Sequence, residues 1–190
     1  MADFELCFKK VIEIEGGFKL INIQGDNGGM TYAGISRNNW PNWAGWIKID
    51  NNQFDTELSQ MVKLFYKEEF WDKIKGDIIG FQSVAYNIYA FAVNTGLDTS
   101  IKICQKIVNV KEDGIFGNST LKALNEFVTN EKDEKIFVLT FSLLKVFRYN
   151  SIVLNDKRRK WDLLNSNQKF LCGWINRVQE GLKYWKIKWY

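Results

Sequence analysis

The amino-acid sequence predicts a mainly α-helical protein with one small β-hairpin near its N-terminus. In several segments apolar residues recur at steps of three and four, which is the period of an amphipathic helix. Residues 83–94 are apolar on almost every side, as in a helix that lies at the centre of a protein. The hairpin is predicted at residues 18–35, where an apolar run precedes the turn-forming sequence Asp-Asn-Gly-Gly.

Helical periodicity covers most of the chain. The predicted helices span residues 2–14, 55–71, 83–94, 99–108, 118–128, 132–149 and 168–182. Asp3 suits the N-cap of the first helix and Asp55 or Thr56 that of the second, because a side-chain oxygen there accepts a bond from a free backbone N–H. The pair Gly16 and Gly17 ends the first helix, since glycine readily adopts the left-handed conformation of a helix end.

Three tryptophans, Trp40, Trp43 and Trp46, recur at steps of three in the segment that follows the hairpin. Pro41, which is the only proline, and Gly45 favour an ordered loop over a helix in this segment. The indole faces could stack on sugar rings. Packing of the loop against the core is the better interpretation for at least two of the three.

Composition excludes several classes of function. A hydrophobic content of 46% allows a sizeable core, so the chain is not intrinsically disordered. A net charge of +4 is too small to indicate a nucleic-acid-binding protein. The absence of histidine rules out histidine-based catalytic triads and the usual histidine zinc sites. The cysteines, Cys7, Cys104 and Cys172, have no Cys-x-x-Cys spacing and are predicted to be reduced core residues.

The N-terminus and the longest apolar run indicate whether the protein is exported by a signal peptide and whether it enters a membrane. The N-terminus lacks a basic segment followed by an apolar core, so we expect synthesis in the cytoplasm without a signal peptide. The run 136–147 is shorter than the roughly 20 residues of a membrane-spanning helix, so we expect no stable membrane insertion. The basic cluster 156–160 is interpreted as an exposed loop, and the alternating residues 184–190 as a short edge strand or extended segment.

The segment 11–36 carries the candidate chemistry. Glu15 ends the first predicted helix, and Asp26 and Thr31 follow it across glycine-rich turns. Hydrolysis of a glycosidic bond needs one carboxylic acid that protonates the leaving oxygen and a second polar group that holds water. The partial negative charge of the last helical turn favours a protonated acid at Glu15. A glutamate before two glycines is also an ordinary helix end, so spacing alone favours a structural interpretation.

Five motifs in order resemble those of glycoside hydrolase family 108, a family of lysozyme-like N-acetylmuramidases many of which were once labelled secretion activators. The motifs of the first half are Glu-Gly-Gly at 15–17 with Asp-Asn-Gly-Gly-Met-Thr at 26–31 and Gly-Ile-Ser at 34–36, the aromatic segment 65–71, and Ala-Val-Asn-Thr-Gly at 92–96. Asp-Gly-Ile-Phe-Gly at 113–117 and Gly-Trp-Ile-Asn-Arg at 173–177 resemble its C-terminal peptidoglycan-binding-like region. One departure is Asn27, where the family usually has proline, and asparagine also favours turns.

The resemblance implies a lysozyme-like helical fold with the hairpin near the active site. It implies Glu15 as the catalytic acid and, by similarity to phage-type lysozymes, Asp26 and Thr31 as the pair that positions water. We add Tyr32, Asn94 and Trp43 as candidate substrate-binding residues. Asn94 could reach the loop that carries Asp26, although capping of its own helix is the simpler interpretation.

The predicted organisation is a lysozyme-like catalytic region at residues 1–98 and a C-terminal helical peptidoglycan-binding-like region at 99–190, packed as one compact body. The predicted activity is cleavage of the bond between N-acetylmuramic acid and N-acetylglucosamine by general acid catalysis with inversion. No metal or other cofactor is expected, and the partners are peptidoglycan glycan strands. We expect a monomer that acts on the cell wall after release, as an endolysin or an exported wall-remodelling enzyme. The alternative is a non-catalytic cell-wall-binding or secretion-accessory protein that kept the fold.

Overall fold

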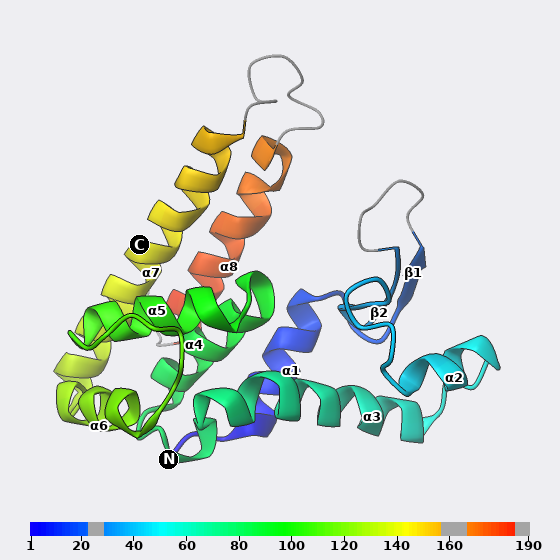
Figure 1. Cartoon of the computed structure of the whole chain (residues 1–190), viewed down its shortest axis with the longest axis horizontal. Coiled ribbons are helices and arrows are strands. Elements are labelled where there is room, and N and C mark those ends of the chain that lie inside the picture. The colour runs from blue at the N-terminus through cyan, green and yellow to red at the C-terminus, as the bar shows by residue number, and fades with distance from the viewer. Residues whose placement is uncertain (23–28, 157–166, 185–190) are drawn as a thin grey trace. The chain divides into compact units, whose positions relative to one another are not determined.

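The computed structural model describes residues 1–22, 29–156 and 167–184. The chain is mainly α-helical with one small sheet, as the sequence predicts (Figure 1). The helices are α1 (Phe4–Ile14), α2 (Gly45–Asp50), α3 (Thr56–Tyr66), α4 (Gln82–Thr95), α5 (Leu97–Ile107), α6 (Asn118–Phe127), α7 (Glu131–Asn155) and α8 (Leu171–Tyr184). The strands are β1 (Leu20–Asn22), β2 (Met30–Tyr32) and β3 (Ile35–Ser36). Short π and 3₁₀ turns lie at Lys67–Trp71, Asp72–Ile74, Gly76–Ile78 and Asn167–Phe170.

The chain divides into two compact units. One comprises Asp3–Lys73, and the other comprises Met1–Ala2 with Ile74–Tyr190. The boundary predicted at residue 98 between a catalytic and a peptidoglycan-binding-like region is based on sequence motifs, whereas these units are defined by packing. The boundary at residue 98 therefore stays a prediction. The basic cluster 156–160 and the C-terminal segment 184–190 lie almost wholly outside the described residues.

The first unit is organised around α1 and α3. The Asp3 carboxylate accepts bonds from the backbone N–H groups of Glu5, at 2.7 Å, and Leu6, which confirms the predicted N-cap. Asp55 caps α3 in the same way. The buried faces of the two helices meet through aromatic rings, with the Phe8 and Tyr66 centroids 5.8 Å apart. This contact joins the end of α3 to the middle of α1.

The sheet is a meander in the order β1-β2-β3, so the predicted hairpin is present and has a third strand. Thr31 lies opposite Ile21 on one side and Ser36 on the other. The turn between β2 and β3 consists of Ala33 and Gly34, which both have positive φ. A two-residue turn with positive φ at both positions is the type I′ turn, whose twist matches that of antiparallel strands.

An ordered loop is predicted for the segment with the three tryptophans, residues 38–50. This prediction is wrong for the second half of the segment, because α2 begins at Gly45. Pro41 stands in the turn before the helix and therefore does not interrupt it. Trp46 and Ile49 are buried at a helical step of three. Lys48 forms ion pairs with carboxylates at the start of α3, which ties the short helix to its neighbour.

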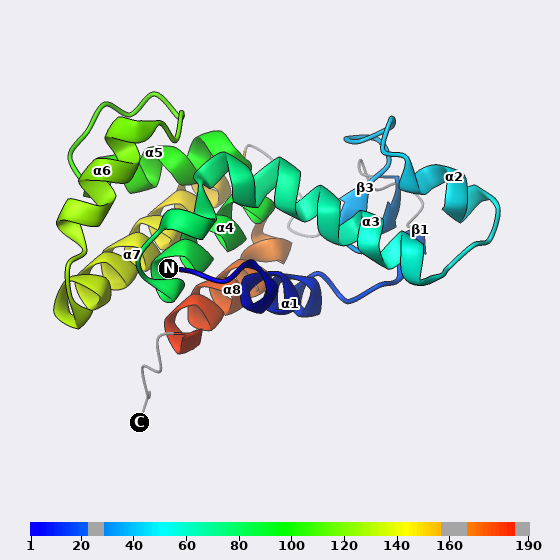
Figure 2. The same cartoon turned by 90° about the horizontal axis from the view of Figure 1, so that it is seen from below.

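The second unit is a helical bundle with α4 at its centre. Helix α4 packs against α5, α7 and α8, and Figures 1 and 2 show α7 beside α8 and the other helices of this bundle. The residues of α4 are buried on nearly all sides, as the apolar segment 83–94 predicts. Cys104 of α5 is buried, as predicted, but Cys172 of α8 is exposed, so the prediction of a core position is wrong for that residue.

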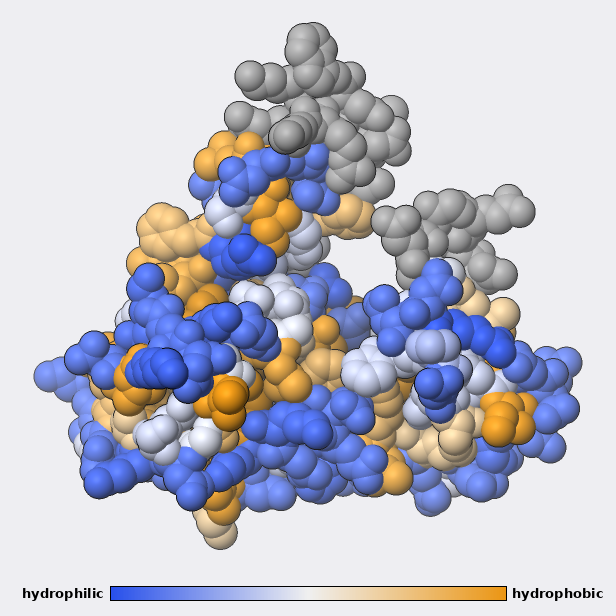
Figure 3. Space-filling model, viewed as in Figure 1, coloured by the Kyte–Doolittle hydropathy of each residue, from blue (hydrophilic) through white to orange (hydrophobic). Residues whose placement is uncertain are grey.

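Helix α7 is longer than predicted and extends from Glu131 to Asn155. Its buried side includes Phe137 and Phe141, whereas Leu143 and Phe147 are exposed, and Figure 3 shows apolar side chains over this helix. Among the described helices it is the one that is long and apolar enough to cross a membrane by length and composition. Packing against α4, α5 and α8 accounts for the apolar character of its buried side. The expected absence of membrane insertion stays a prediction.

Candidate functional site

Glu15 is held by the end of α1. Its N–H donates to Val11 O at 2.9 Å, and Gly17 N–H donates to Ile12 O at 2.8 Å. With a bond from Gly16 N–H to the Glu13 carbonyl and a φ of 92° at Gly16, this is a Schellman helix end. The predicted helix stop at the two glycines is confirmed, and it places the Glu15 side chain at a fixed point rather than on a frayed turn.

The Glu15 side chain lies against the turn between β2 and β3. A Cβ added at Gly34 would lie 3.2 Å from both Cβ and Cγ of Glu15 and would overlap the Tyr66 hydroxyl. Tyr66 is buried, and its hydroxyl donates to Ala33 O at 2.8 Å. Burial, and to a lesser extent the charge of Glu15, raises the pKa of Tyr66 far above its usual value, so the phenol stays protonated. Through this hydrogen bond Tyr66 stabilises the β2–β3 turn, against which the Glu15 side chain packs.

Thr31 lies at the centre of β2 and is half-buried. Its hydroxyl donates to Gly29 O at 3.4 Å, a long and weak bond. Glu15 and Thr31 thus belong to the same small unit, the first beside the β2–β3 turn and the second two residues before it. Asp26 lies outside the described residues, so its predicted pairing with Glu15 stays a prediction.

The predicted substrate-binding residues have different surroundings. Tyr32 is only 3% exposed and its ring packs on that of Phe54, at 5.8 Å between centroids. Burial, followed by the charge of Asp55, raises the pKa of Tyr32. Asn94 lies at the end of α4 in the second unit, where its Oδ1 accepts a bond from the Tyr149 hydroxyl at 2.8 Å. Both residues have structural partners, and their roles in substrate binding stay predictions.

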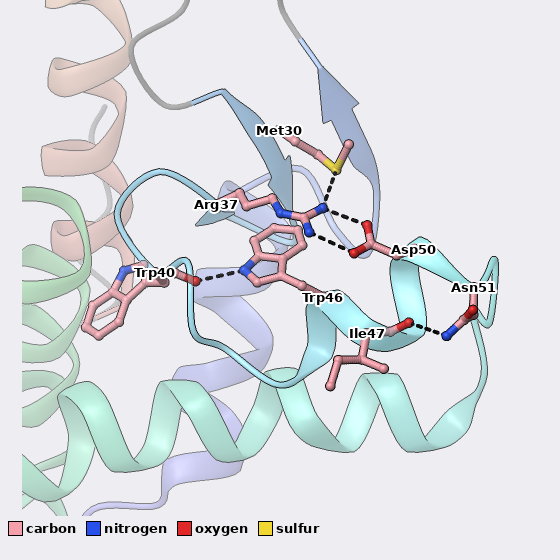
Figure 4. A network of polar contacts seen from close by, with 7 residues as sticks. All are labelled: Met30, Arg37, Trp40, Trp46, Ile47, Asp50 and Asn51. Atoms are coloured by element: carbon pink, nitrogen blue, oxygen red, sulfur yellow. Dashed lines mark hydrogen bonds and ion pairs between the residues drawn. The ribbon is translucent and has the colours of Figure 1, made fainter.

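A network of polar contacts joins the sheet to α2. Arg37 donates two bonds of 2.7 Å to the Asp50 carboxylate and lies 3.7 Å from the Met30 sulfur, and Figure 4 shows these contacts. The Arg37 guanidinium also lies over the Trp46 ring, whose Nε1–H donates to Trp40 O at 2.8 Å. This bond fixes the backbone of the tryptophan-containing loop.

The tryptophan loop forms one wall of a pocket that the sequence does not reveal. We name it the indole pocket and define it by Trp40, Trp43, Phe65, Glu68 and Glu69; its volume is about 460 Å³. Glu68 and Glu69 fall in the helix that the sequence predicts over residues 55–71, and on pattern alone they are most simply part of its solvated face. The only sequence signal for the pocket is the spacing of the tryptophans, and this does not reveal which part of α3 faces them.

Two family models match the chain in succession. Residues 8–96 match the family described as Glycosyl hydrolase 108. The N-terminal half is a glycosyl hydrolase 108 domain. Residues 99–179 match the family described as Predicted Peptidoglycan domain. The two domains together indicate a hydrolase or a binder of peptidoglycan, and the family resemblance found in the five motifs is confirmed.

Solved structures add a match in three dimensions. SagA of Brucella abortus aligns with 96% of this chain and 93% of its own, at 21% identity and a TM-score of 0.66. This likeness confirms the predicted mainly α, lysozyme-like fold of the glycosyl hydrolase 108 protein. Among curated proteins, no sequence matches the chain.

Proposed function

We propose that this protein is an N-acetylmuramidase that cleaves the bond between N-acetylmuramic acid and N-acetylglucosamine in peptidoglycan. The observation that carries the proposal is the position of Glu15 within the glycosyl hydrolase 108 domain. Glu15 lies at the Schellman end of α1, and its side chain packs against the β2–β3 turn. An acid that must protonate a leaving oxygen needs such a fixed position.

In the proposed reaction Glu15 donates a proton to the glycosidic oxygen as the bond to the anomeric carbon breaks. Asp26 accepts a proton from a water molecule that Thr31 helps to orient, and this water attacks the opposite face of the sugar. The result is inversion, which requires the two carboxyl groups to be about 6.5–9.5 Å apart. Proton transfer between carboxyl groups and water needs no cofactor, so we expect a chelator to leave the rate unchanged.

The decisive experiment is Glu15→Gln assayed on purified cell walls by turbidity and by release of reducing ends. We expect a loss of about 100-fold or more, because the amide cannot donate the proton. Glu13→Gln is the matched control, since Glu13 lies in the same helix with an exposed side chain. A Glu15→Gln rate within a few-fold of wild type, with unchanged thermal unfolding, would exclude Glu15 as the acid.

The second candidate is a peptidoglycan-binding protein without catalytic activity, which the match of residues 99–179 favours. Sedimentation of the protein with purified peptidoglycan, together with no release of reducing ends, would support this candidate over the muramidase. We further propose that the protein acts as a monomer on the cell wall after its release from the cytoplasm. Equilibrium sedimentation tests the monomer, and fractionation of producing cells tests the site of action.

A further inference from the structure

The indole pocket is preformed by ring packing. Trp40 meets the edge of Phe65 at 4.9 Å between centroids, and Trp43 meets Trp46 at 5.2 Å with an interplanar angle of 90°. Edge-to-face pairs of this kind hold each ring in one orientation. Gly45 is required here, because a Cβ at this position would overlap the Trp43 ring. Little ordering is therefore needed when a ligand enters the pocket.

The opposite wall is one face of the α3 region. Met61, Leu64, Phe65, Glu68 and Glu69 recur at steps of three and four, so an apolar surface ends in two carboxylates. The carboxylates lie where α3 passes into the single π-helical turn Lys67–Trp71. Turns of this kind are frequent at functional sites.

The charge of the pocket is negative. Among the described residues, neither Glu68 nor Glu69 forms an ion pair. The lysines on either side along the chain are already paired, Lys63 with Glu5 and Lys67 with Asp72. Two carboxylates beside indole rings therefore face the pocket, and no cation of the described part of the chain is paired with them.

This combination matches a positively charged ligand. Indole rings attract a cation over their faces, and carboxylates accept hydrogen bonds from an ammonium group. The side chains of Met61 and Leu64 add an apolar surface for an aliphatic stem. A neutral sugar could stack on Trp40 or Trp43, but it would leave two negative charges unbalanced. An anionic ligand would be repelled.

We propose that the indole pocket binds a primary ammonium group on an aliphatic stem, and that in peptidoglycan this is the free side-chain amine of the diamino acid in the stem peptide. The identity of the physiological ligand rests on the proposed action on peptidoglycan. Binding of the amine in the pocket would make uncrosslinked stem peptides a point of recognition beside the glycan strand.

The test is a titration of the full chain with the tripeptide N-acetyl-L-Ala-γ-D-Glu-L-Lys, in which the lysine side chain provides the one amine, and NMR of the indole N–H signals detects binding. Trp40→Phe and Trp43→Phe assign the two signals. We expect the tripeptide to shift both, and the same tripeptide acetylated on the lysine amine to bind at least about tenfold more weakly, because a charge-assisted contact is lost. Raised salt is expected to weaken binding of the free amine.

The double variant Glu68→Gln/Glu69→Gln is expected to weaken tripeptide binding by about tenfold or more while leaving thermal unfolding unchanged, since both substitutions are isosteric. Glu13→Gln, with one exposed charge removed elsewhere in the unit, is expected to bind like wild type. Equal binding of the acetylated tripeptide, equal binding by the double variant, or shifts with N-acetylglucosamine but not with the tripeptide would each overturn the proposal. Binding is measured without turnover, so its outcome is independent of whether Glu15→Gln abolishes hydrolysis.

Discussion

Lys145 is the residue whose substitution tests the energetics of the helical bundle most directly. It is 2% exposed, and its Nζ lies 3.5 Å from Asn87 Oδ1 and 5.6 and 5.9 Å from the ring centroids of Phe91 and Phe141. Among the described residues no carboxylate pairs with it. Burial lowers the pKa of Lys145 from 10.5 to about 7.

The lowered pKa makes stability rise with pH. Between pH 7 and 10.5 the unfolded chain keeps the Lys145 proton that the folded chain has lost, so unfolding takes up a proton and becomes less favourable as pH increases. Below pH 7 the folded state carries the full cost of the buried amine, about 5 kcal/mol from the difference between the two pKa values. Between pH 7 and pH 9 about 2 kcal/mol of this cost is relieved.

The variant Lys145→Met keeps most of the side-chain volume and removes the titrating group. It also deprives the buried Asn87 Oδ1 of its bond from Lys145, which costs about 1–3 kcal/mol. We therefore expect the variant to be about 1–3 kcal/mol more stable than wild type at pH 7 and nearly equal to it at pH 9. The exposed Lys132 at the start of α7 provides the control Lys132→Met, which should follow wild type at every pH.

Urea unfolding of the three proteins at pH 7, 8 and 9 measures these differences. All other ionisable groups are common to the three proteins, apart from the exposed Lys132 of the control, so their contributions cancel when the proteins are compared at one pH. The informative quantity is the change with pH in the stability difference between wild type and Lys145→Met. If this difference is constant from pH 7 to pH 9, Lys145 is not buried as a neutral amine and the reasoning is refuted.

Three further substitutions test individual contacts. Gln105→Leu removes the bonds that hold the loop around Gly114, and we expect a loss of about 2–3 kcal/mol with faster hydrogen exchange at the Gly114 amide; unchanged exchange would contradict this. Tyr66→Phe leaves Ala33 O without its donor and should cost about 1–2 kcal/mol in urea unfolding, and a neutral result would show that water replaces the hydroxyl. Gly34→Ala places a Cβ at a backbone φ of +80° and against the Tyr66 hydroxyl, so we expect a loss of stability of about 1–3 kcal/mol and slower clearing of cell walls. Wild-type stability together with wild-type clearing would refute the close approach of Gly34 to Tyr66 and Glu15.

The features predicted correctly from sequence are those that depend on neighbouring residues. The N-cap at Asp3 and the helix stop at Gly16 and Gly17 involve bonds within one turn of the helix. The central position of α4 follows from its all-round apolar composition. The two helix ends are stabilised by local bonds, and the burial of α4 is marked by its own composition, so each feature leaves a signal within a short stretch of sequence.

The features that were missed depend on segments distant in the chain. Glu68 and Glu69 have the pattern of a solvated helix face, and only the packing of Trp40 and Trp43 against Phe65 makes them part of a pocket. Lys145 likewise reads as a polar interruption of an apolar run. Lys145 is buried because its own helix, α7, packs against α4 and α8, and the sequence around Lys145 contains no information on those two helices. Pro41 gave a misleading signal, because a proline that precedes a helix resembles one that prevents it.

The two described residues of the proposed catalytic set are positioned by different means. Glu15 is placed by local bonds at the end of α1 and by the close approach of Gly34, so any backbone change at either point moves the acid. Thr31 is placed by strand register. A slip of one residue in β2 would turn its side chain to the other face of the sheet, but pairing with Ile21 on one side and Ser36 on the other opposes such a slip. The tight β2–β3 turn serves both, because it sets the register of Thr31 and provides the surface on which Glu15 rests. Substitutions at this turn should therefore impair the acid and the water-positioning hydroxyl together, whereas substitutions in α1 should impair the acid alone.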